Sequence, residues 1–190
     1  MQAEGGASLS HSDADGSARR RPLGIFFGVA LTAYLLDLGT KVLAVDRLEG
    51  REPVEVIGDV LQLNLVRNPG AAFSTGTSYT LLLSLVAVGA VVVVLFLSRK
   101  LGDRLWAFGL GALLGGVLGN LTDRVFRDPG VLRGHVIDFL QLPNWPVFNI
   151  ADICINVAAG VIILQAFRGV SYTGARERDT DDAASGADPR

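Results

Sequence analysis

Five ionisable residues lie within or beside long apolar runs of this sequence, where a charged side chain is costly and usually serves a function. They are one lysine and four acids: Asp37, Lys41, Asp123, Asp138 and Asp152. Asp37, Asp123 and Asp152 fall in three different apolar segments. At a helix rise of about 1.5 Å per residue, they lie about 21 Å, about 27 Å and about 24 Å from one end of their segments. We therefore expect these three acids to converge at one level.

Two of these acids follow an asparagine by three residues. Asn120 precedes Asp123, and Asn149 precedes Asp152. Side chains three residues apart share a helix face, so each amide can donate to its carboxylate and orient it where water is scarce. Helix assembly alone would explain one such pair. Two pairs at one depth favour a functional site.

The surroundings of the acids divide them into two kinds. Asp123 is followed directly by Arg124, with a second arginine one turn on, and such neighbours keep a carboxylate ionised. Asp138 lies in an apolar run without an adjacent cation, so loss of hydration should raise its pKa. Aspartic-protease chemistry needs two close carboxyl groups that share one proton. Asp138 with Asp152 fits that requirement better than Asp123 with Asp152.

Two other kinds of function use the same residues. A proton-coupled small membrane carrier could use the acids as a relay, but they gather at one level and the sequence shows no repeated halves. A serine–lysine peptidase could use Lys41 to deprotonate Ser74 or Ser78. Lys41 lies one helical turn after Asp37, however, and an ion pair between these two is the simpler interpretation.

The elements that must position these residues are membrane helices. Of the 190 residues, 49% are hydrophobic and only 19% are charged, and the net charge of −2 gives no basic footprint for nucleic acid. A span needs about 20 mostly apolar residues, and lipid requires helical backbone there. The sequence therefore predicts an all-α membrane fold, a bundle of four transmembrane helices over residues 23–45, 78–98, 105–122 and 147–167.

The distribution of lysine and arginine predicts the orientation of the bundle. Basic residues are concentrated before the first span, in the short link between the second and third, and after the fourth. By the positive-inside rule both termini are cytoplasmic, and loops 46–77 and 123–146 lie outside. Residues 1–22 and 169–190 are rich in small and polar residues and are expected to be disordered cytoplasmic tails.

The first outer loop carries the pattern of a β-hairpin. Residues 54–57 and 61–67 favour strands and are separated by Gly58-Asp59. Asn68-Pro69-Gly70 then predicts a turn. We expect a small extracytoplasmic sheet at the membrane surface.

Five sequence blocks, in this order, resemble the lipoprotein signal peptidases (signal peptidase II) over about residues 23–168. The blocks are Asp37–Lys41, Arg67–Ser74, Gly115–Arg124, Val136–Phe139 and Phe148–Asp152. The resemblance implies a monomeric aspartyl endopeptidase of the bacterial cytoplasmic (inner) membrane, with four helices and an extracytoplasmic β-cradle, here about residues 53–75. It implies no cofactor, no metal and no nucleic acid; the partners would be membrane lipid and the substrate.

The resemblance also implies the reaction and the site. Such enzymes remove signal peptides from prolipoproteins by cutting before a diacylglyceryl-modified cysteine, near the outer face of the membrane. Their catalytic pair corresponds to Asp138 and Asp152, in agreement with the surroundings of these two acids. The supporting and substrate-binding residues would be Asp37, Lys41, Asn68, Gly70, Asn120, Asp123, Arg124 and Asn149.

One stretch departs from the family's commonest form. Residues 126–133, between the Asp123 and Asp138 blocks, look longer than usual and contain a Pro-Gly turn. We interpret this stretch as a surface insertion at the rim of the site.

Overall fold

The computed structural model describes residues 11–70 and 78–175. Within these residues four helices alternate with three strands: α1 (His11–Leu48), β1 (Val54–Ile57), β2 (Leu61–Asn68), α2 (Ser78–Ser98), α3 (Arg104–Phe126), β3 (Val136–Gln141) and α4 (Ile150–Phe167). All four helices contain a stretch long and apolar enough to cross a membrane: Pro22–Leu48, Thr80–Ser98, Arg104–Phe126 and Ile150–Phe167. The predicted four-helix membrane fold is therefore confirmed.

Helix α3 is the centre of the bundle. More than half of its apolar window is buried, against about a fifth for each of the other three spans. Glycines on α3 allow this close packing: a Cβ atom on Gly115 would lie 2.5 Å from the Ala30 carbonyl oxygen of α1, and one on Gly116 would lie 2.6 Å from the Ala151 carbonyl oxygen of α4. The side chains of α1 and α4 therefore reach across to residues of α3.

The helix boundaries differ from the predicted spans for local reasons. Helix α4 begins at Ile150 rather than 147, because Asn149 forms its N-cap. Helix α3 continues for a further turn beyond residue 122 and so includes Asp123. Helix α1 begins at His11, so Leu23 marks the start of its apolar part rather than of the helix. The rest of the predicted N-terminal tail, residues 1–10, lies outside the described residues.

The chain after α4 turns back onto the bundle instead of leaving it at once. The Gly102 amide donates to the Tyr172 carbonyl oxygen at 2.9 Å, and the Trp106 indole donates to the Val170 carbonyl oxygen at 2.7 Å. These contacts hold residues 170–172 against the link between α2 and α3. The remainder of the predicted C-terminal tail, residues 176–190, lies outside the described residues.

The three strands form an antiparallel sheet in the order β1-β2-β3. The β1–β2 hairpin was predicted and is confirmed, with Gly58 in the left-handed region at φ +46°. Strand β3 was not predicted; its apolar run was interpreted only as the surroundings of Asp138. In the β2–β3 ladder Asn68 lies opposite Val136 and Val66 lies opposite Asp138, so the sheet brings Asn68 diagonally next to Asp138.

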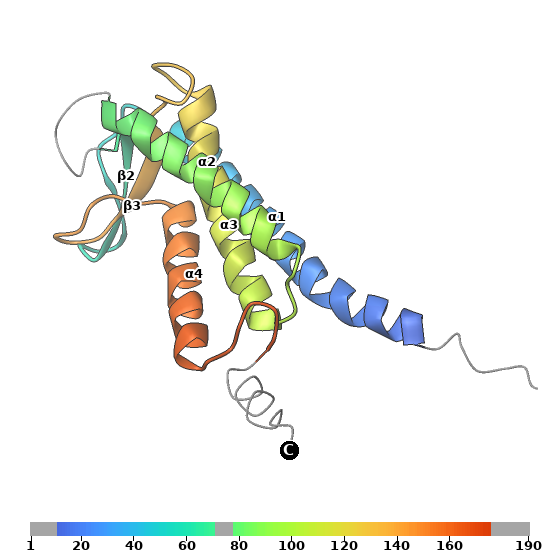
Figure 1. The fold of residues 1–190 in the computed structure, drawn as a ribbon. Helices are drawn as coiled ribbons and strands as arrows, with labels where there is room; N and C mark the ends of the chain where they lie inside the picture. The colour runs from blue at the N-terminus through green and yellow to red at the C-terminus, as the bar shows by residue number, and fades with distance from the viewer. Residues whose placement is uncertain (1–10, 71–77, 176–190) are drawn as a thin grey trace, which may run out of the picture.

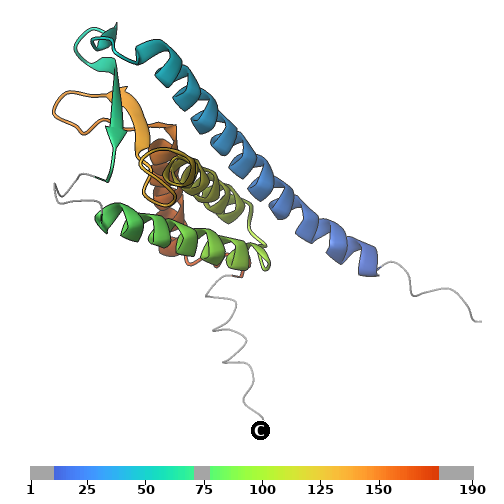
Figure 2. The same cartoon turned by 90° about the horizontal axis from the view of Figure 1, so that it is seen from above.

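The sheet lies at the end of the bundle where α1 and α3 end and α2 and α4 begin (Figures 1 and 2). The beginning of α1 and the end of α4 lie at the opposite end (Figure 1). The described chain therefore enters and leaves the bundle at the same end, as four spans require. The assignment of that end to the cytoplasm remains a prediction.

Candidate active site

A buried lysine organises the sheet end of the bundle. Lys41 of α1 is fully buried, and its Nζ lies 2.7 Å from Asp37 Oδ2, 2.9 Å from Asp123 Oδ2 and 2.8 Å from Asn120 Oδ1. The predicted ion pair between Asp37 and Lys41 is confirmed. Two carboxylates and an amide oxygen therefore contact the Lys41 amine, and none of these contacts is the serine hydroxyl that a serine–lysine peptidase requires. Of that alternative's two serines, Ser74 lies outside the described residues.

The two acids that contact Lys41 also bind backbone groups of other elements. Asp37 Oδ1 accepts a hydrogen bond from the Ala151 amide of α4 at 2.9 Å. Asp123 accepts one from the Ile137 amide of β3 at 3.1 Å, and its other oxygen pairs with Nε of Arg127. These two acids therefore fasten α4 and β3 to α1 and α3.

Among the described residues, Arg124 forms no ion pair with Asp123. The cations that pair with Asp123 are Lys41 and Arg127, and Arg127 lies one helical turn after Asp123 on the same helix face. The Arg124 guanidinium donates to the Asn120 carbonyl oxygen at 3.3 Å and interacts electrostatically with Asp152, Asp138 and Asp123. Of the two arginines that the sequence places near Asp123, the structure pairs it with the one at the i,i+4 spacing.

Asp138 is buried on β3 and is held by two amides. Its Oδ2 accepts from Asn68 Nδ2 at 2.8 Å, and its Oδ1 accepts from Asn149 Nδ2 at 2.6 Å. The pKa of Asp138 is raised to about 6, chiefly by burial. Repulsion from Asp152 also raises it, whereas the two amides and the Lys41 charge lower it. The expected rise in this pKa is thus present, and its main cause is the expected loss of hydration.

Asp152 lies in the first turn of α4 and is also held by amides. Its Oδ1 accepts from Asn120 Nδ2 at 2.9 Å, and its Oδ2 accepts from the Asn149 backbone amide at 3.2 Å. Asn149 Oδ1 in turn accepts from the Asp152 amide at 2.9 Å, so the two residues form a capping box. The predicted Asn149–Asp152 pair exists, but as a helix cap.

The predicted pairing of Asn120 with Asp123 was wrong. Both oxygens of Asp123 are already bound by Lys41, Arg127 and a backbone amide. The Asn120 amide instead crosses from α3 to α4 and donates to Asp152.

The four acids of this site therefore form two pairs of different chemistry. Asp37 and Asp123 are bound by cations, whereas among the described residues the hydrogen-bond donors to Asp138 and Asp152 are amides. Asn149 joins the second pair, because its side chain donates to Asp138 and its backbone to Asp152. Two carboxyl groups close enough to repel each other can share a single proton, with one ionised and one neutral.

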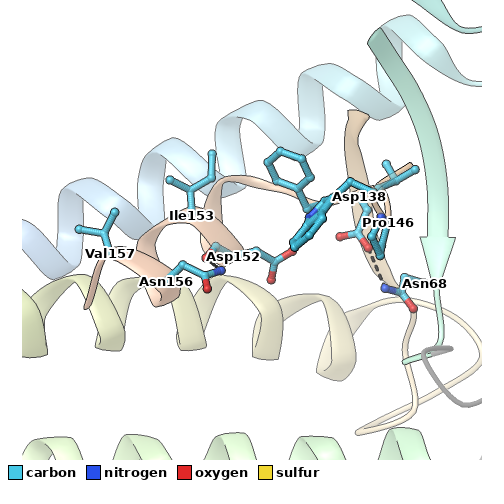
Figure 3. Close-up of a pocket in the computed structure, with 10 residues that line it drawn as sticks. Asn68, Asp138, Pro146, Asp152, Ile153, Asn156 and Val157 are labelled. Carbon is cyan, nitrogen blue, oxygen red and sulfur yellow. Dashed lines mark hydrogen bonds between the residues drawn. The ribbon is translucent and has the colours of Figure 1, made fainter. Parts of the chain in front are cut away.

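Both carboxylates face one open cavity of about 450 Å³ (Figure 3). Its polar wall contains Asn68 and Asn156 beside the two acids, and the rest is apolar or aromatic: Trp145, Pro146, Val147, Phe148, Ile153 and Val157. In Figure 3 the Asp138 and Asp152 side chains reach into the space between α4 and β3. Such a cavity has room for a peptide segment with an apolar flank. The wall that precedes α4 was missed, and its one signal in the sequence is the Pro- and aromatic-rich stretch 143–148.

The Asn68-Pro69-Gly70 turn fixes the asparagine that touches Asp138. The Gly70 amide donates to Asn68 Oδ1 at 2.8 Å, which leaves Asn68 Nδ2 directed at Asp138. Gly70 has φ +96°, a backbone conformation that favours glycine. The expected role of Asn68 and Gly70 toward the substrate stays a prediction, and the loop after them, residues 71–77, lies outside the described residues.

No group of three or more His, Cys, Asp or Glu side chains that could hold a metal ion occurs within residues 11–70 and 78–175.

The profile of the family described as Signal peptidase (SPase) II matches residues 29–168. The chain belongs to the signal peptidase II family. A lipoprotein signal peptidase of Streptomyces griseus is 43% identical over 176 residues, which cover 93% of this chain and 90% of that protein. The lipoprotein signal peptidase of Rhodococcus jostii is 47% identical over 87% of this chain and 86% of its own length. That of Mycobacterium avium is 46% identical over 86% and 90%.

Solved structures share the fold. Two bacterial membrane enzyme structures superpose with TM-scores of 0.67 and 0.68, at 24% and 23% identity. They cover 75% and 81% of this chain, and 92% and 94% of their own chains. As a member of the signal peptidase II family, this protein is a membrane-embedded aspartic endopeptidase. The carrier alternative has no support among these matches.

Proposed function

We propose that this signal peptidase II cleaves bacterial prolipoproteins just before their diacylglyceryl-modified cysteine, with Asp138 and Asp152 as its catalytic pair. The observation that carries the proposal is their shared setting. The two carboxyl groups come from a strand and a helix, accept hydrogen bonds from amides, are joined through Asn149 and face one cavity. The three relatives described above are lipoprotein signal peptidases, which supports the choice of substrate.

The pair would act on a water molecule placed between the carboxyl groups. The ionised carboxyl group takes a proton from the water as its oxygen bonds to the scissile carbonyl carbon, and the neutral one gives its proton to the carbonyl oxygen. When the tetrahedral intermediate breaks down, the C–N bond breaks and the carboxyl group that took the water's proton gives it to the leaving amine. The other carboxylate takes a proton from a hydroxyl of the intermediate as the new carboxylic acid forms, which restores the pair. The two groups titrate as a unit, so acid and base are not assigned to individual residues.

The walls of the cavity suit a substrate that stays attached to the bilayer. Ile153 and Val157 continue the cavity along α4, and both are more than 40% exposed on this apolar helix. A diacylglyceryl group can remain in lipid beside these residues while the peptide lies across the sheet. The β1–β2 hairpin and the turn after it would hold the peptide extended. The positive-inside rule places this end of the bundle at the outer face of the membrane.

The other residues of the site act on the geometry of the pair. Lys41, Asp37 and Asp123 hold α1, α3, β3 and α4 together. Asn68, Asn120 and Asn149 orient the carboxyl groups. Arg124 adds positive charge near both catalytic acids.

The test is cleavage of a lipidated prolipoprotein by the purified full chain. Asp138→Asn and Asp152→Asn should each lower the cleavage rate by about 10²–10⁴-fold, the range associated with loss of a general acid or base. Asp46→Asn is the matched control, because Asp46 is an exposed acid near the C-terminal end of α1, which lies at the same end of the bundle as the catalytic pair. Normal cleavage by either Asp138→Asn or Asp152→Asn would refute the pair.

A third variant separates catalysis from assembly. Asp123→Asn removes a charge that balances Lys41 and Arg127, so we expect reduced folded yield and a smaller loss of activity per folded molecule. If Asp123→Asn instead folded normally and lost all activity, Asp123 would belong to the catalytic group.

A further inference from the structure

The loop between α3 and β3, which contains most of the stretch 126–133 that we interpret as an insertion, has a fixed conformation that peptide cleavage does not explain. The Gly134 amide donates to the Arg124 carbonyl oxygen, and the His135 amide donates to the Asp128 carbonyl oxygen, both at 3.0 Å. From α2, the buried Ser84 hydroxyl donates to the Leu132 carbonyl oxygen at 2.7 Å. The loop therefore closes on itself and is also fastened to α2, at the sheet end of the bundle (Figure 1).

A second cavity lies between this loop and β2. Its volume is about 530 Å³, and it is lined by Arg67, Phe126, Arg127, Asp128, Pro129 and His135. It shares none of these residues with the catalytic cavity. Consecutive residues of a strand point to opposite faces, and Asn68 lines the catalytic cavity while Arg67 lines this one.

The cavity presents three side chains that can donate hydrogen bonds to an anion, beside one acid, Asp128, whose carboxylate would repel it. Arg67 pairs with Glu49 at 2.8 Å, but both side chains are about half exposed, and such surface pairs contribute little and exchange readily. Arg127 donates to Asp123 through its Nε. Among the described residues, none is hydrogen-bonded to the two terminal nitrogens of the Arg127 guanidinium. His135 adds a ring N–H. Guanidinium groups match the oxygens of a phosphate group with paired hydrogen bonds.

An apolar side chain at the cavity suits a lipid rather than a soluble anion. Phe126, which lines the cavity, is the last residue of the membrane-spanning helix α3 and is 82% exposed. The end of a span lies where lipid headgroups begin. A lipid whose headgroup is bound here would thus have its acyl chains next to Phe126.

We propose that this second cavity binds the phosphate group of an anionic phospholipid, with Arg67, Arg127 and His135 as donors and Phe126 against the acyl chains. The insertion forms the outer wall of the site. Because Arg127 also pairs with Asp123, a bound lipid is in contact with the ionic group that fastens β3 to the bundle. This site is separate from the catalytic pair, and its test does not depend on cleavage.

Native mass spectrometry of the purified full chain measures this binding directly. The protein is titrated with phosphatidylglycerol and, separately, with phosphatidylcholine of the same acyl chains. We expect phosphatidylglycerol to bind about tenfold more tightly, which corresponds to one charge-assisted hydrogen bond. Arg67→Gln and His135→Gln should each reduce this preference. Arg133→Gln is the matched control, because Arg133 is an exposed arginine of the same loop that does not line the cavity.

Three results would overturn the proposal. Equal affinity for the two lipids would show that the headgroup is not recognised. An equal loss in Arg67→Gln and Arg133→Gln would show that general surface charge, rather than a site, attracts the lipid. Sodium phosphate that raised the Tm of the wild-type protein as much as phosphatidylglycerol does, at matched ionic strength, would assign the site to a soluble anion.

Discussion

Replacing Asn68 by leucine should shift the pH range in which the enzyme works. Asn68 Nδ2 donates to Asp138 Oδ2 at 2.8 Å, and this hydrogen bond favours the ionised carboxylate and lowers the pKa of Asp138. With the donor gone, Asp138 keeps its proton to a higher pH. A pair that works with one shared proton loses activity when that proton leaves, so the alkaline limb of the pH–rate profile should move upward.

The size of the shift follows from the free energy of the lost hydrogen bond, because the bond from Asn68 is one of the contacts that keep the pKa of Asp138 down to about 6. A hydrogen bond to a charged group contributes about 1.5–3 kcal/mol in a dry site, and one pKa unit corresponds to about 1.36 kcal/mol. The catalytic cavity is open to solvent, so we take the low end of that range. The alkaline limb of Asn68→Leu should therefore lie about one pH unit above that of the wild type.

The assay is cleavage of a lipidated prolipoprotein over a range of pH, with kcat/KM normalised to each variant's maximum. Asn64→Leu is the matched control: Asn64 lies four residues earlier on β2 and bonds Gln141 of β3 at 2.8 Å, so the same kind of cross-strand contact is lost away from Asp138. Asn68→Asp keeps an acceptor for the Gly70 amide and adds a negative charge, so it should shift the limb at least as far. A limb that stays in place or moves downward in Asn68→Leu would refute the reasoning.

Three further predictions concern stability, each measured as the Tm of the purified protein in detergent. Lys41→Met should cost about 3–5 kcal/mol, because it leaves two buried carboxylates, Asp37 among them, without their cation. Gly119→Ala places a Cβ atom 2.3 Å from Asp37 Oδ2 and should cost about 1–3 kcal/mol, whereas Gly160→Ala, with nothing within 4 Å, should not lower the Tm. Because the pKa of Asp138 rises from 3.8 to about 6 on folding, the wild type should lose up to about 3 kcal/mol relative to Asp138→Asn as the pH rises from about 4 to above 6. A constant difference across that range would contradict the raised pKa.

The helices and the hairpin could be predicted because their signals are local. Apolar length alone identified all four spans, and Gly58-Asp59 between two strand-forming runs identified the turn. Strand β3 was missed because its six residues resemble any buried run until β2 is present to pair with them. A short apolar segment does not specify its own partner.

The residues that form the site could be predicted better than the hydrogen bonds and ion pairs between them. The acids and amides were identified, and the structure brings them together at one end of the bundle. The partner of Asn120 could not be read from spacing, because it depends on how closely α4 approaches α3 at Gly116. The choice of Arg127 over Arg124 likewise depends on which side of α3 the loop and sheet occupy. Distances between elements decide both questions.

Asn149 has two duties, which use different atoms of one side chain: its Oδ1 caps α4 and its Nδ2 donates to Asp138. It begins α4 and it joins the two carboxyl groups that we propose to be catalytic. A stabilising change elsewhere that compensated for a lost helix cap would leave Asp138 without its donor, and a new donor for Asp138 would leave α4 uncapped. Selection for folding and selection for turnover therefore act on the same side chain, the first through its oxygen and the second through its nitrogen. Asp or Ser at this position would keep the cap of α4 but remove the donor to Asp138, so only an amide serves both duties.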